Sequence, residues 1–365
     1  MFSALDFIHI YVEKINCIMQ ILTIQNRILY WYAENKRDLP FRKSKDPYLI
    51  WISEVMLQQT KMKTMIPYFN KWIDLYPTLK KVAETELSDL LKLWEGLGYY
   101  SRCRNFHKAT IILNRDNNGL IPKDWHTFRS LPGIGDYTAS AVFSIAYNLP
   151  YVVVDVNVKR VMARVLGLKN LSNKNNSIIL NNLKDWICKK HPGDFNQAMM
   201  ELGALVCTPQ KPSCYACPIK TNCIAFIKGS PELYPYKKKK IIKPHFITVG
   251  GLIWRKNRFY IQKRNISSML GGLWEFPSVK VKKTESIETA LKKLIEKEFG
   301  IVPKIEKKIG IIEHSYSHFS ITFHGYHCKE DGIYFESKTE HEWIKLKDID
   351  SFAFPKANHK IFNLI

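Results

Sequence analysis

Four cysteines lie close together in the second half of this chain, and their spacing constrains how the surrounding residues can fold. They form the pattern Cys207-x6-Cys214-x2-Cys217-x5-Cys223 and make up half of the eight cysteines in the 365-residue sequence. Four thiolates can hold either a Zn²⁺ ion or a [4Fe–4S] cluster. Structural zinc sites usually contain two C-x2-C pairs, whereas this pattern contains one. The spacing therefore favours an iron–sulfur cluster.

The chain is strongly basic, with 55 Lys and Arg against 33 Asp and Glu and a formal net charge of +22. Such a charge is typical of proteins that bind a polyanion, most often nucleic acid. No run of 18 apolar residues occurs, and the N-terminus has no basic region ahead of its apolar part. We therefore expect a cytoplasmic protein without a membrane partner.

The hydrophobic pattern divides the chain. Up to residue 226 the apolar residues repeat with helical spacing, for example from Val158 to Leu166, directly after Asp155. Residues 227–243 combine Gly and Pro with a run of four lysines, which is typical of a linker. We interpret residues 1–18 as a dispensable extension, since Met19 could also serve as a start.

The remaining residues, 244–365, alternate between patterns of strands and of a helix. Strands are predicted over 245–254, 258–264 and 320–328, and a helix over 286–300. The sequence thus predicts a mainly α N-terminal region followed by a smaller α/β or α+β domain.

The stretch LPGIGDYTASA, residues 131–141, contains two glycines just before a predicted helix. Gly133 and Gly135 lack a Cβ, so the backbone can adopt positive φ and approach a ligand closely. Asp136 is a candidate helix cap, and free N–H groups at a helix N-terminus favour a phosphate. Because residues 123–131 predict a short helix, we interpret the stretch as a helix–hairpin–helix that holds the DNA backbone. A plain turn between two helices is the alternative.

These motifs together resemble the endonuclease III superfamily of DNA glycosylases. The resemblance rests on LPGIGDYTASA, on Asp155 twenty residues after Gly135, and on the cysteine pattern. Within that superfamily, three further motifs resemble adenine DNA glycosylases of the MutY type: SEVMLQQT (53–60), GLGYYSRCRNFHKA (96–109) and VDVNVKRV (154–161). The resemblance covers about residues 20 to 365.

The resemblance implies a fold, a cofactor and a substrate. It implies a helical catalytic region over 19–226, with a six-helix barrel module at about 47–155 and a cluster module from 19–46 and 156–226. In this family the four cysteines hold one [4Fe–4S] cluster. The family removes adenine mispaired with 8-oxoguanine, so the implied partner is double-stranded DNA with an A:8-oxoguanine or A:G mispair. A monomer associated with the nucleoid is expected.

Two carboxyl groups are candidates for the chemistry. Glu54 lies in the apolar run LIWISEVML, and apolar surroundings raise a carboxyl pKa and keep the group protonated as a general acid. By resemblance, Glu54 protonates adenine N7 and Asn157 orients the site. By the same resemblance, Asp155 stabilises an oxocarbenium-like transition state at the sugar or forms a transient covalent bond with it. The alternatives are a solvent-facing glutamate and an aspartate that only caps its helix.

Tyr137 is informative because bifunctional relatives in the superfamily have a lysine at this position. A phenol cannot form an imine with the sugar, so the sequence predicts base removal by water without strand cleavage. A tyrosine that only packs at the helix start is the alternative. The resemblance also assigns Gln59 and Tyr99 to the DNA helix beside the lesion, where Tyr99 can act as a wedge.

Residues 271–301 resemble a Nudix box in which two of the glutamates that bind Mg²⁺ are replaced. Where the box has glutamates that bind Mg²⁺, this chain has Leu294 and Lys297, and an ammonium group cannot bind Mg²⁺. The implied domain keeps the fold without the hydrolase activity. By resemblance, Tyr316-Ser317-His318 recognise the 8-oxoguanine, although the family usually has Phe at the first of these positions.

Three other functions fit part of the sequence. A Nudix-type nucleotide hydrolase with a DNA-tethering region is disfavoured by the broken metal box. A DNA-binding protein without catalysis is disfavoured by the intact Glu54, Tyr137, Asp155 and Asn157. A pyrimidine-removing glycosylase is disfavoured by the Nudix-like domain with its SYSHF motif.

One residue beside the predicted site departs from the family: Val156 stands where glycine is common. A β-branched residue at this position restricts the backbone next to Asp155.

Overall fold

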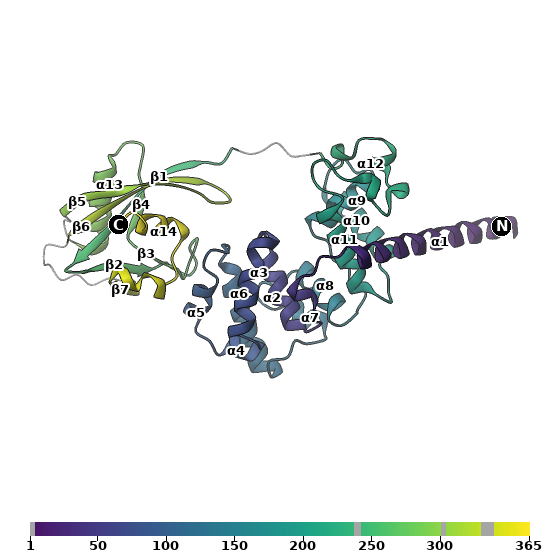
Figure 1. The fold of residues 1–365 in the computed structure, drawn as a ribbon, viewed down its shortest axis with the longest axis horizontal. Helices are drawn as coiled ribbons and strands as arrows, with labels where there is room; N and C mark the ends of the chain where they lie inside the picture. Colours follow the sequence, from purple (N-terminus) through teal and green to yellow (C-terminus); the bar gives the residue numbers. More distant parts are fainter. Residues whose placement is uncertain (1–3, 237–241, 301–303, 330–338) are drawn as a thin grey trace. The chain divides into compact units, whose positions relative to one another are not determined.

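The computed structural model describes residues 4–236, 242–300, 304–329 and 339–365, with side chains described at residue 16 and from residue 18 onward within these ranges (Figure 1). It divides into two compact units. The first contains Met1–Lys80 and Ala109–Lys239, and the second contains Lys81–Lys108 and Lys240–Ile365. Within the described residues, no helix combines the length and apolar character needed to cross a membrane.

The first unit is helical, as predicted. Its longer helices are α1 (Ala4–Asn35), α2 (Pro47–Leu57), α3 (Met62–Leu75), α8 (Asp136–Ile145), α9 (Val156–Val165), α10 (Asn173–Trp186) and α11 (Pro192–Leu205). Shorter segments are η1 (Pro40–Arg42), α7 (Trp125–Arg129), η2 (Cys214–Ala216), η3 (Lys220–Asn222), α12 (Ile224–Ile227) and η4 (Pro231–Leu233). Two further helices cross the boundaries between the units: α4 (Leu79–Ala83) and α6 (Ser101–Asn117).

Helix α2 begins as the sequence predicts. The Asp46 carboxylate accepts a hydrogen bond from the Tyr48 amide at 2.8 Å, and Pro47 takes the first helical position. Almost every following side chain is buried, including Trp51 and Ile52. This explains why the run from Tyr48 to Leu57 is apolar apart from Ser53 and Glu54 and is not amphipathic.

Helices α1, α9, α10 and α11 pack around a separate apolar cluster in the same unit. Its centre includes Ile28, Val161, Leu183 and Phe195, all almost completely buried. The amphipathic spacing predicted from Val158 to Leu166 directs this face of α9 into the cluster. Three of the four clustered cysteines, Cys207, Cys217 and Cys223, pack against its edge.

The glycine hairpin connects α7 to α8. Gly133 has a φ of +78°, a left-handed conformation that favours glycine. Gly135 has a φ of −97° and is itself the residue before the helix, so the expectation that Asp136 caps α8 is wrong. Asp136 is instead the first residue of the helix, and its carboxylate pairs with Arg129 at 2.6 Å. An acidic side chain there also interacts favourably with the helix dipole.

The second unit contains a mixed sheet. Its strands are β1 (His245–Arg255), β2 (Arg258–Lys263), β3 (Trp274–Glu275), β4 (Ser278–Lys280), β5 (Lys304–Ser315), β6 (Ser320–Lys329) and β7 (His341–Ile344). The order is β3-β2-β1-β6-β5, with β4 pairing with β1 and β7 pairing with β2. Strands β1 and β6 are parallel, and the other pairs are antiparallel.

A helix covers each face of this sheet. Side chains of β1 alternate between faces, so Val249 and Ile253 pack with α13 (Ile287–Phe299) while Leu252 packs with α14 (Lys356–Phe362). The predicted α/β class of the C-terminal part is thereby confirmed. A short 3-10 helix, η5 (Leu346–Ser351), precedes α14.

The boundaries predicted at 226 and 243 remain predictions, and residues 237–241 of the predicted linker lie outside the described residues. The second unit also includes α5 (Leu87–Leu93) and the first part of α6, which follow each other in sequence within Lys81–Lys108. This grouping of a segment from the helical region with the sheet is not evident from the sequence.

Gly250 on β1 provides a test of the packing of the sheet. A Cβ at this position would lie 2.6 Å from Phe323 Cζ, 2.9 Å from Phe276 Cε2 and 3.0 Å from the Pro277 carbonyl oxygen. Because both rings are buried, we expect Gly250→Ala to lower the free energy of unfolding of this unit by about 1–3 kcal/mol. Urea denaturation measures this change. Ile247→Ala, at a partly exposed position of the same strand, should change it by less than about 0.5 kcal/mol; equal midpoints for the two variants would contradict the packing described.

Candidate active site

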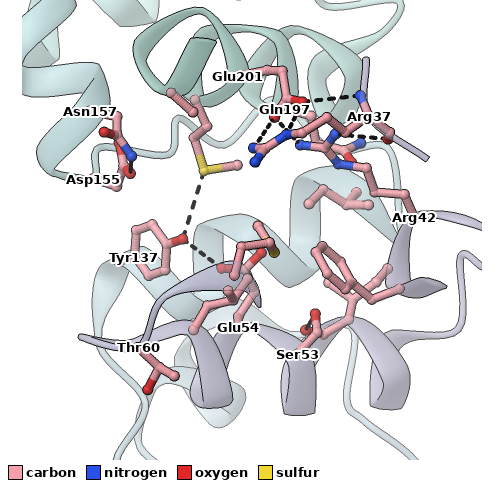
Figure 2. Close-up of a pocket in the computed structure, with 17 residues that line it drawn as sticks. Arg37, Arg42, Ser53, Glu54, Thr60, Tyr137, Asp155, Asn157, Gln197 and Glu201 are labelled. Carbon is pink, nitrogen blue, oxygen red and sulfur yellow. Dashed lines mark hydrogen bonds and ion pairs between the residues drawn. The ribbon is translucent and has the colours of Figure 1, made fainter. Parts of the chain in front are cut away.

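A cavity in the first unit brings together four of the predicted site residues (Figure 2). Glu54 comes from α2, Tyr137 from the first turn of α8, Asp155 from the start of α9, and Asn157 from α9 itself. These positions are distant in sequence, since Glu54 and Tyr137 are 83 residues apart. The helical packing described above is what collects them around one space.

Glu54 is one of three carboxyl residues that line this cavity among the described residues. Its side chain is only 5% exposed, and its Oε2 accepts a hydrogen bond of 2.5 Å from the Tyr137 hydroxyl. Burial raises the pKa of the Glu54 carboxyl to about 7, opposed by the Tyr137 hydrogen bond and reinforced by the negative charge of Asp155. A substantial fraction of Glu54 is therefore protonated at neutral pH and can donate a proton.

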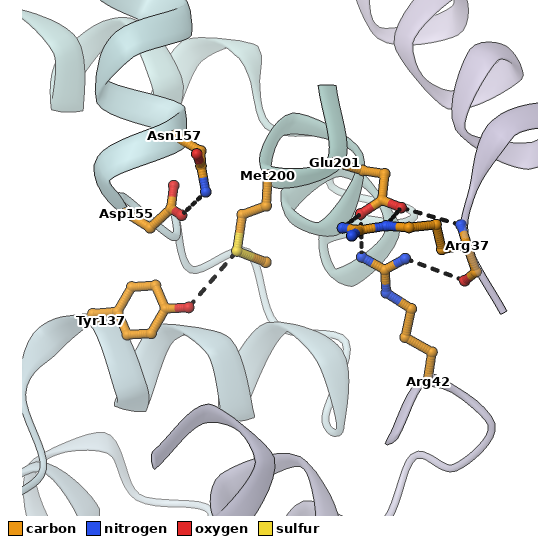
Figure 3. Close-up of polar contacts among 7 residues, drawn as sticks. All are labelled: Arg37, Arg42, Tyr137, Asp155, Asn157, Met200 and Glu201. Carbon is orange, nitrogen blue, oxygen red and sulfur yellow. Dashed lines mark hydrogen bonds and ion pairs between the residues drawn. The ribbon is translucent and has the colours of Figure 1, made fainter. Parts of the chain in front are cut away.

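Tyr137 points its hydroxyl between Glu54 and α11. The hydroxyl lies 3.7 Å from the sulfur of Met200 (Figure 3), in addition to its contact with Glu54 (Figure 2). Burial raises the pKa of the Tyr137 phenol well above its ordinary value, and the Glu54 charge adds to this. Tyr137 thus remains a neutral hydrogen-bond donor at any physiological pH.

Asp155 both caps a helix and lines the cavity, so these two interpretations are compatible. Its Oδ1 accepts a hydrogen bond of 2.7 Å from the Val158 amide, and its Oδ2 accepts one of 2.8 Å from Asn157 Nδ2. Burial raises the pKa of Asp155, and these hydrogen bonds partly counteract the rise. Val156 is the first residue of α9 and is 75% exposed, and Asp155 retains its capping hydrogen bond beside it.

Asn157 is held in turn by Arg160. One Arg160 NH2 group donates to Asn157 Oδ1 at 2.9 Å and to the Gly203 carbonyl at 2.8 Å, while Arg160 Nε donates to the Cys207 carbonyl at 2.8 Å. Hydrogen bonds therefore run from Asp155 through Asn157 and Arg160 to the first of the four clustered cysteines.

A buried ion-pair cluster forms another wall of the cavity and was not predicted from the sequence. Glu201 on α11 is 1% exposed and accepts hydrogen bonds from Arg37 Nε at 2.7 Å and from Arg42 NH2 at 2.8 Å (Figure 3). Burial alone would raise the pKa of Glu201, but the two guanidinium groups outweigh it and lower the pKa to about 2. The available signal was a charged residue inside the apolar run AMMELGAL.

The four cysteines are partly buried and close enough to affect one another. Burial raises the pKa of the Cys217 thiol to about 12, and the neighbouring Cys207, Cys223 and Cys214 add to this rise. Arg164 donates to the Cys207 sulfur at 3.2 Å. Considering the described residues alone, no group of three or more His, Cys, Asp or Glu side chains is arranged to hold a single metal ion.

The remaining predicted site residues lie elsewhere. Gln59 is in the first unit and Tyr99 in the second, and both have left-handed backbones, with φ of 58° and 49°. Such non-glycine conformations are strained and often occur at functional sites. Within the second unit, the Tyr99 hydroxyl forms a short hydrogen bond with Ser317 Oγ, while His318 is exposed. Tyr316 is partly buried and packs against Phe319.

Comparisons with known proteins agree with this architecture. Residues 52–187 match the model of the HhH-GPD superfamily of base excision DNA repair proteins, and residues 248–364 match the NUDIX domain. Among solved structures, a thermostable thymine-DNA glycosylase is similar at 27% identity and a TM-score of 0.54, covering 57% of this chain and 98% of its own. An endonuclease III bound to DNA, with a TM-score of 0.50 and 24% identity, covers 58% of this chain and 98% of its own and shares the fold.

Relatives similar over most of the chain share one name. The adenine DNA glycosylase of Buchnera aphidicola from Acyrthosiphon pisum is 36% identical over 92% of this chain and 95% of its own length. The human adenine DNA glycosylase is 30% identical over 95% of this chain and 74% of its own length. The chain therefore belongs to the adenine DNA glycosylase family.

Proposed function

We propose that this protein is a monofunctional DNA glycosylase of base excision repair, which flips adenine out of an A:8-oxoguanine or A:G mispair and hydrolyses its N-glycosidic bond. The observation that carries the proposal is the buried Glu54 carboxyl, with a pKa of about 7, in one cavity with Asp155. One group can donate a proton while the other carries a negative charge, which is the division of roles that glycoside hydrolysis requires.

Glu54 acts on the leaving base. Adenine is a poor leaving group as an anion, so a proton delivered to the base, at N7 by analogy with the family, lowers the barrier to bond cleavage. Tyr137 holds the Glu54 carboxyl in a fixed orientation through its 2.5 Å hydrogen bond. A proton donor that is already oriented needs little reorganisation during the reaction.

Asp155 acts on the sugar. As the bond to the base breaks, positive charge develops on the deoxyribose ring, and the Asp155 carboxylate stabilises it electrostatically or through a transient covalent bond. The Val158 amide and Asn157 fix the carboxylate at 2.7 and 2.8 Å. Asn157 thereby acts as an orienting residue.

The absence of a lysine supports hydrolysis without strand cleavage. Of the described residues that line the cavity, none is a lysine, and Tyr137 occupies the position where bifunctional relatives have one. A phenol cannot form an imine with the sugar, so water completes the reaction and leaves an abasic site.

The ion-pair cluster of Arg37, Arg42 and Glu201 supports a polar pocket for the flipped base. Guanidinium groups donate to ring nitrogens, and a carboxylate accepts from an exocyclic amine; adenine presents both kinds of group. Arg37 Nε and Arg42 NH2 donate to the Glu201 carboxylate at 2.7 and 2.8 Å. These hydrogen bonds orient the three buried charges before the flipped base binds.

Contacts to the DNA strands follow from the other predicted residues. Gly133, with its φ of +78°, and Gly135 at the start of α8 allow the backbone to approach a phosphate, whose charge the free N–H groups of α8 attract. Gln59 and Tyr99 then occupy the space beside the flipped adenine. The net charge of +22 also supports binding to DNA.

The C-terminal sheet would read the opposite base, with Tyr316, Ser317 and His318 on the loop between β5 and β6. The alternative Nudix hydrolase activity is disfavoured because Leu294 packs into the core beneath α13 instead of presenting a carboxylate to a metal. Lys297, one turn further on, offers no ligand either.

We infer that Cys207, Cys214, Cys217 and Cys223 hold one [4Fe–4S] cluster, which stabilises the fold around α9. The set of four thiols fits this cluster, and the single C-x2-C pair differs from the two such pairs that structural zinc sites usually contain. Hydrogen bonds from Arg160 to the Cys207 carbonyl would connect the cluster loop to Asn157. We also infer that the protein acts as a monomer in the cytoplasm, bound to the nucleoid.

The activity can be tested with a duplex that contains adenine opposite 8-oxoguanine. We expect abasic product that is revealed as strand breaks only after alkali treatment. Glu54→Gln should lower the excision rate about 10²- to 10⁴-fold because it removes the proton donor. The matched control Glu34→Gln, at an exposed position of α1, should leave the rate unchanged. Strand breaks without alkali, or full activity of Glu54→Gln, would contradict the mechanism.

The cofactor assignment predicts that the purified protein is brown and contains about four iron atoms per chain. Elemental analysis and the visible absorption spectrum measure both properties. Cys217→Ser should lose the colour, whereas Cys328→Ser, at a buried cysteine of the sheet, should keep it. Zinc as the stoichiometric metal would refute this assignment.

A further inference from the structure

Glu95 lies just after α5 and connects this segment to two parts of the C-terminal region within the second unit. Its Oε1 accepts hydrogen bonds from the Phe354 amide at 2.7 Å and from His359 Nε2 at 2.5 Å. Its Oε2 accepts one from Lys92 Nζ at 2.7 Å. Lys92 in turn donates to the Phe352 carbonyl at 2.9 Å. All of these residues belong to the same compact unit.

The side chains of Lys92 and Glu95 act on residues 352–354 as a neighbouring β-strand would. The backbone is extended at Phe352, with φ of −121° and ψ of 145°, and the Trp274 amide donates to the Ala353 carbonyl at 2.8 Å. In extended backbone, the carbonyl of one residue and the amide of the residue two positions later point to the same side. A residue of a parallel strand would pair with both of these groups, and here an ammonium and a carboxylate do so instead.

This arrangement depends on the charge of Glu95. Burial alone would raise the pKa of the Glu95 carboxyl, but hydrogen bonds from His359, Lys92 and the Phe354 amide outweigh it and lower the pKa. The carboxylate is 18% exposed, so water cannot easily replace these partners. Charge-assisted hydrogen bonds in such a setting are stronger than neutral ones and define the geometry.

The same segment carries Tyr99, four residues after Glu95. Between them, Gly96 and Gly98 have φ of 98° and 73°, and Tyr99 itself has a φ of 49°. The Tyr99 hydroxyl meets Ser317 in a short hydrogen bond, and Arg104 NH1 donates to the Gly271 carbonyl at 2.6 Å on the far side of the loop. Along the sequence, Tyr99 thus lies between two residues that attach this segment by hydrogen bonds, Glu95 and Arg104.

We propose that Glu95 is a positioning residue that fixes segment 81–108 to the edge formed by residues 352–354 and His359, and so sets the contact between Tyr99 and Ser317. Recognition of the base opposite adenine would then depend on Glu95, although Glu95 itself touches neither base. The specificity part of this inference rests on the proposed function, because Tyr99 and Ser317 are proposed DNA contacts.

The test is Glu95→Gln in the full-length protein. The glutamine side chain has the same shape as glutamate but carries no charge. Its NH2 group would face the Lys92 ammonium, and because both groups are donors, this hydrogen bond is lost. We expect the preference for A:8-oxoguanine over A:G, as the ratio of single-turnover excision rates, to fall about tenfold. The rate on A:G should stay within about twofold of the wild type because the cavity around Glu54 is untouched. Glu288→Gln, an exposed glutamate of α13, serves as the control for the lost charge and should match the wild type.

Two further measurements separate positioning from a general loss of structure. Hydrogen exchange followed by mass spectrometry should show faster exchange in Glu95→Gln over residues 352–359 and 95–104 together, with α9 and α11 unchanged. Combining Glu95→Gln with Ser317→Ala should reduce the preference no further than Ser317→Ala alone, because both changes remove one interaction.

Opposite results would overturn the proposal. Unchanged exchange at residues 352–359 would show that Glu95 does not hold this edge. Faster exchange with the full preference retained would show that the attachment does not set specificity, as would an equal loss on both substrates. A wild-type protein without any preference would instead refute the proposed recognition of 8-oxoguanine, and the exchange measurement would still decide whether Glu95 holds the edge.

Discussion

Tyr137 donates a hydrogen bond of 2.5 Å to Glu54, and the proposed chemistry of the cavity depends on this contact. It requires α2 to bury its apolar faces, so that Glu54 is 5% exposed, and it requires the glycine hairpin to start α8 directly before Tyr137. The two largest effects on the pKa of Glu54 oppose each other. Burial raises the pKa of Glu54, and the hydrogen bond from Tyr137 lowers it. At the resulting pKa of about 7, both the protonated acid and the anion are populated near neutral pH.

The other groups of the cavity are fixed by a similar logic, in which each buried polar group has a partner. Asp155 is held by the Val158 amide and Asn157, and Asn157 by Arg160. Glu201 is held by Arg37 and Arg42. A Cβ on Gly203 would lie 2.6 Å from Asn157 Cβ, so even the spacing of α9 and α11 depends on a residue without a side chain. The cavity is therefore preorganised before any DNA binds.

Much of this architecture follows from local sequence signals. Asp46 with Pro47 and Asp155 mark helix starts, and alternation of apolar residues predicts β1, β2 and β6. Three kinds of feature could not be predicted. Strand β3 has two residues and β4 three, too few to show a period of two, and the charged β5 conceals its pattern. The capping of α8 by Gly135 instead of Asp136 depends on hairpin geometry. The ion pairs of Glu201 and the contacts of Glu95 join residues far apart in sequence, which no local pattern records.

The proposed mechanism requires Glu54 to be protonated near neutral pH. The most direct test is a titration of the protein labelled with ¹³C at glutamate Cδ. The Glu54 resonance is assigned by its loss in Glu54→Gln. The structure predicts a midpoint near pH 7 for Glu54, which Tyr137→Phe shifts upward because the hydrogen bond that favours the anion is removed. A midpoint below about pH 5, close to that of an exposed glutamate, would contradict the account.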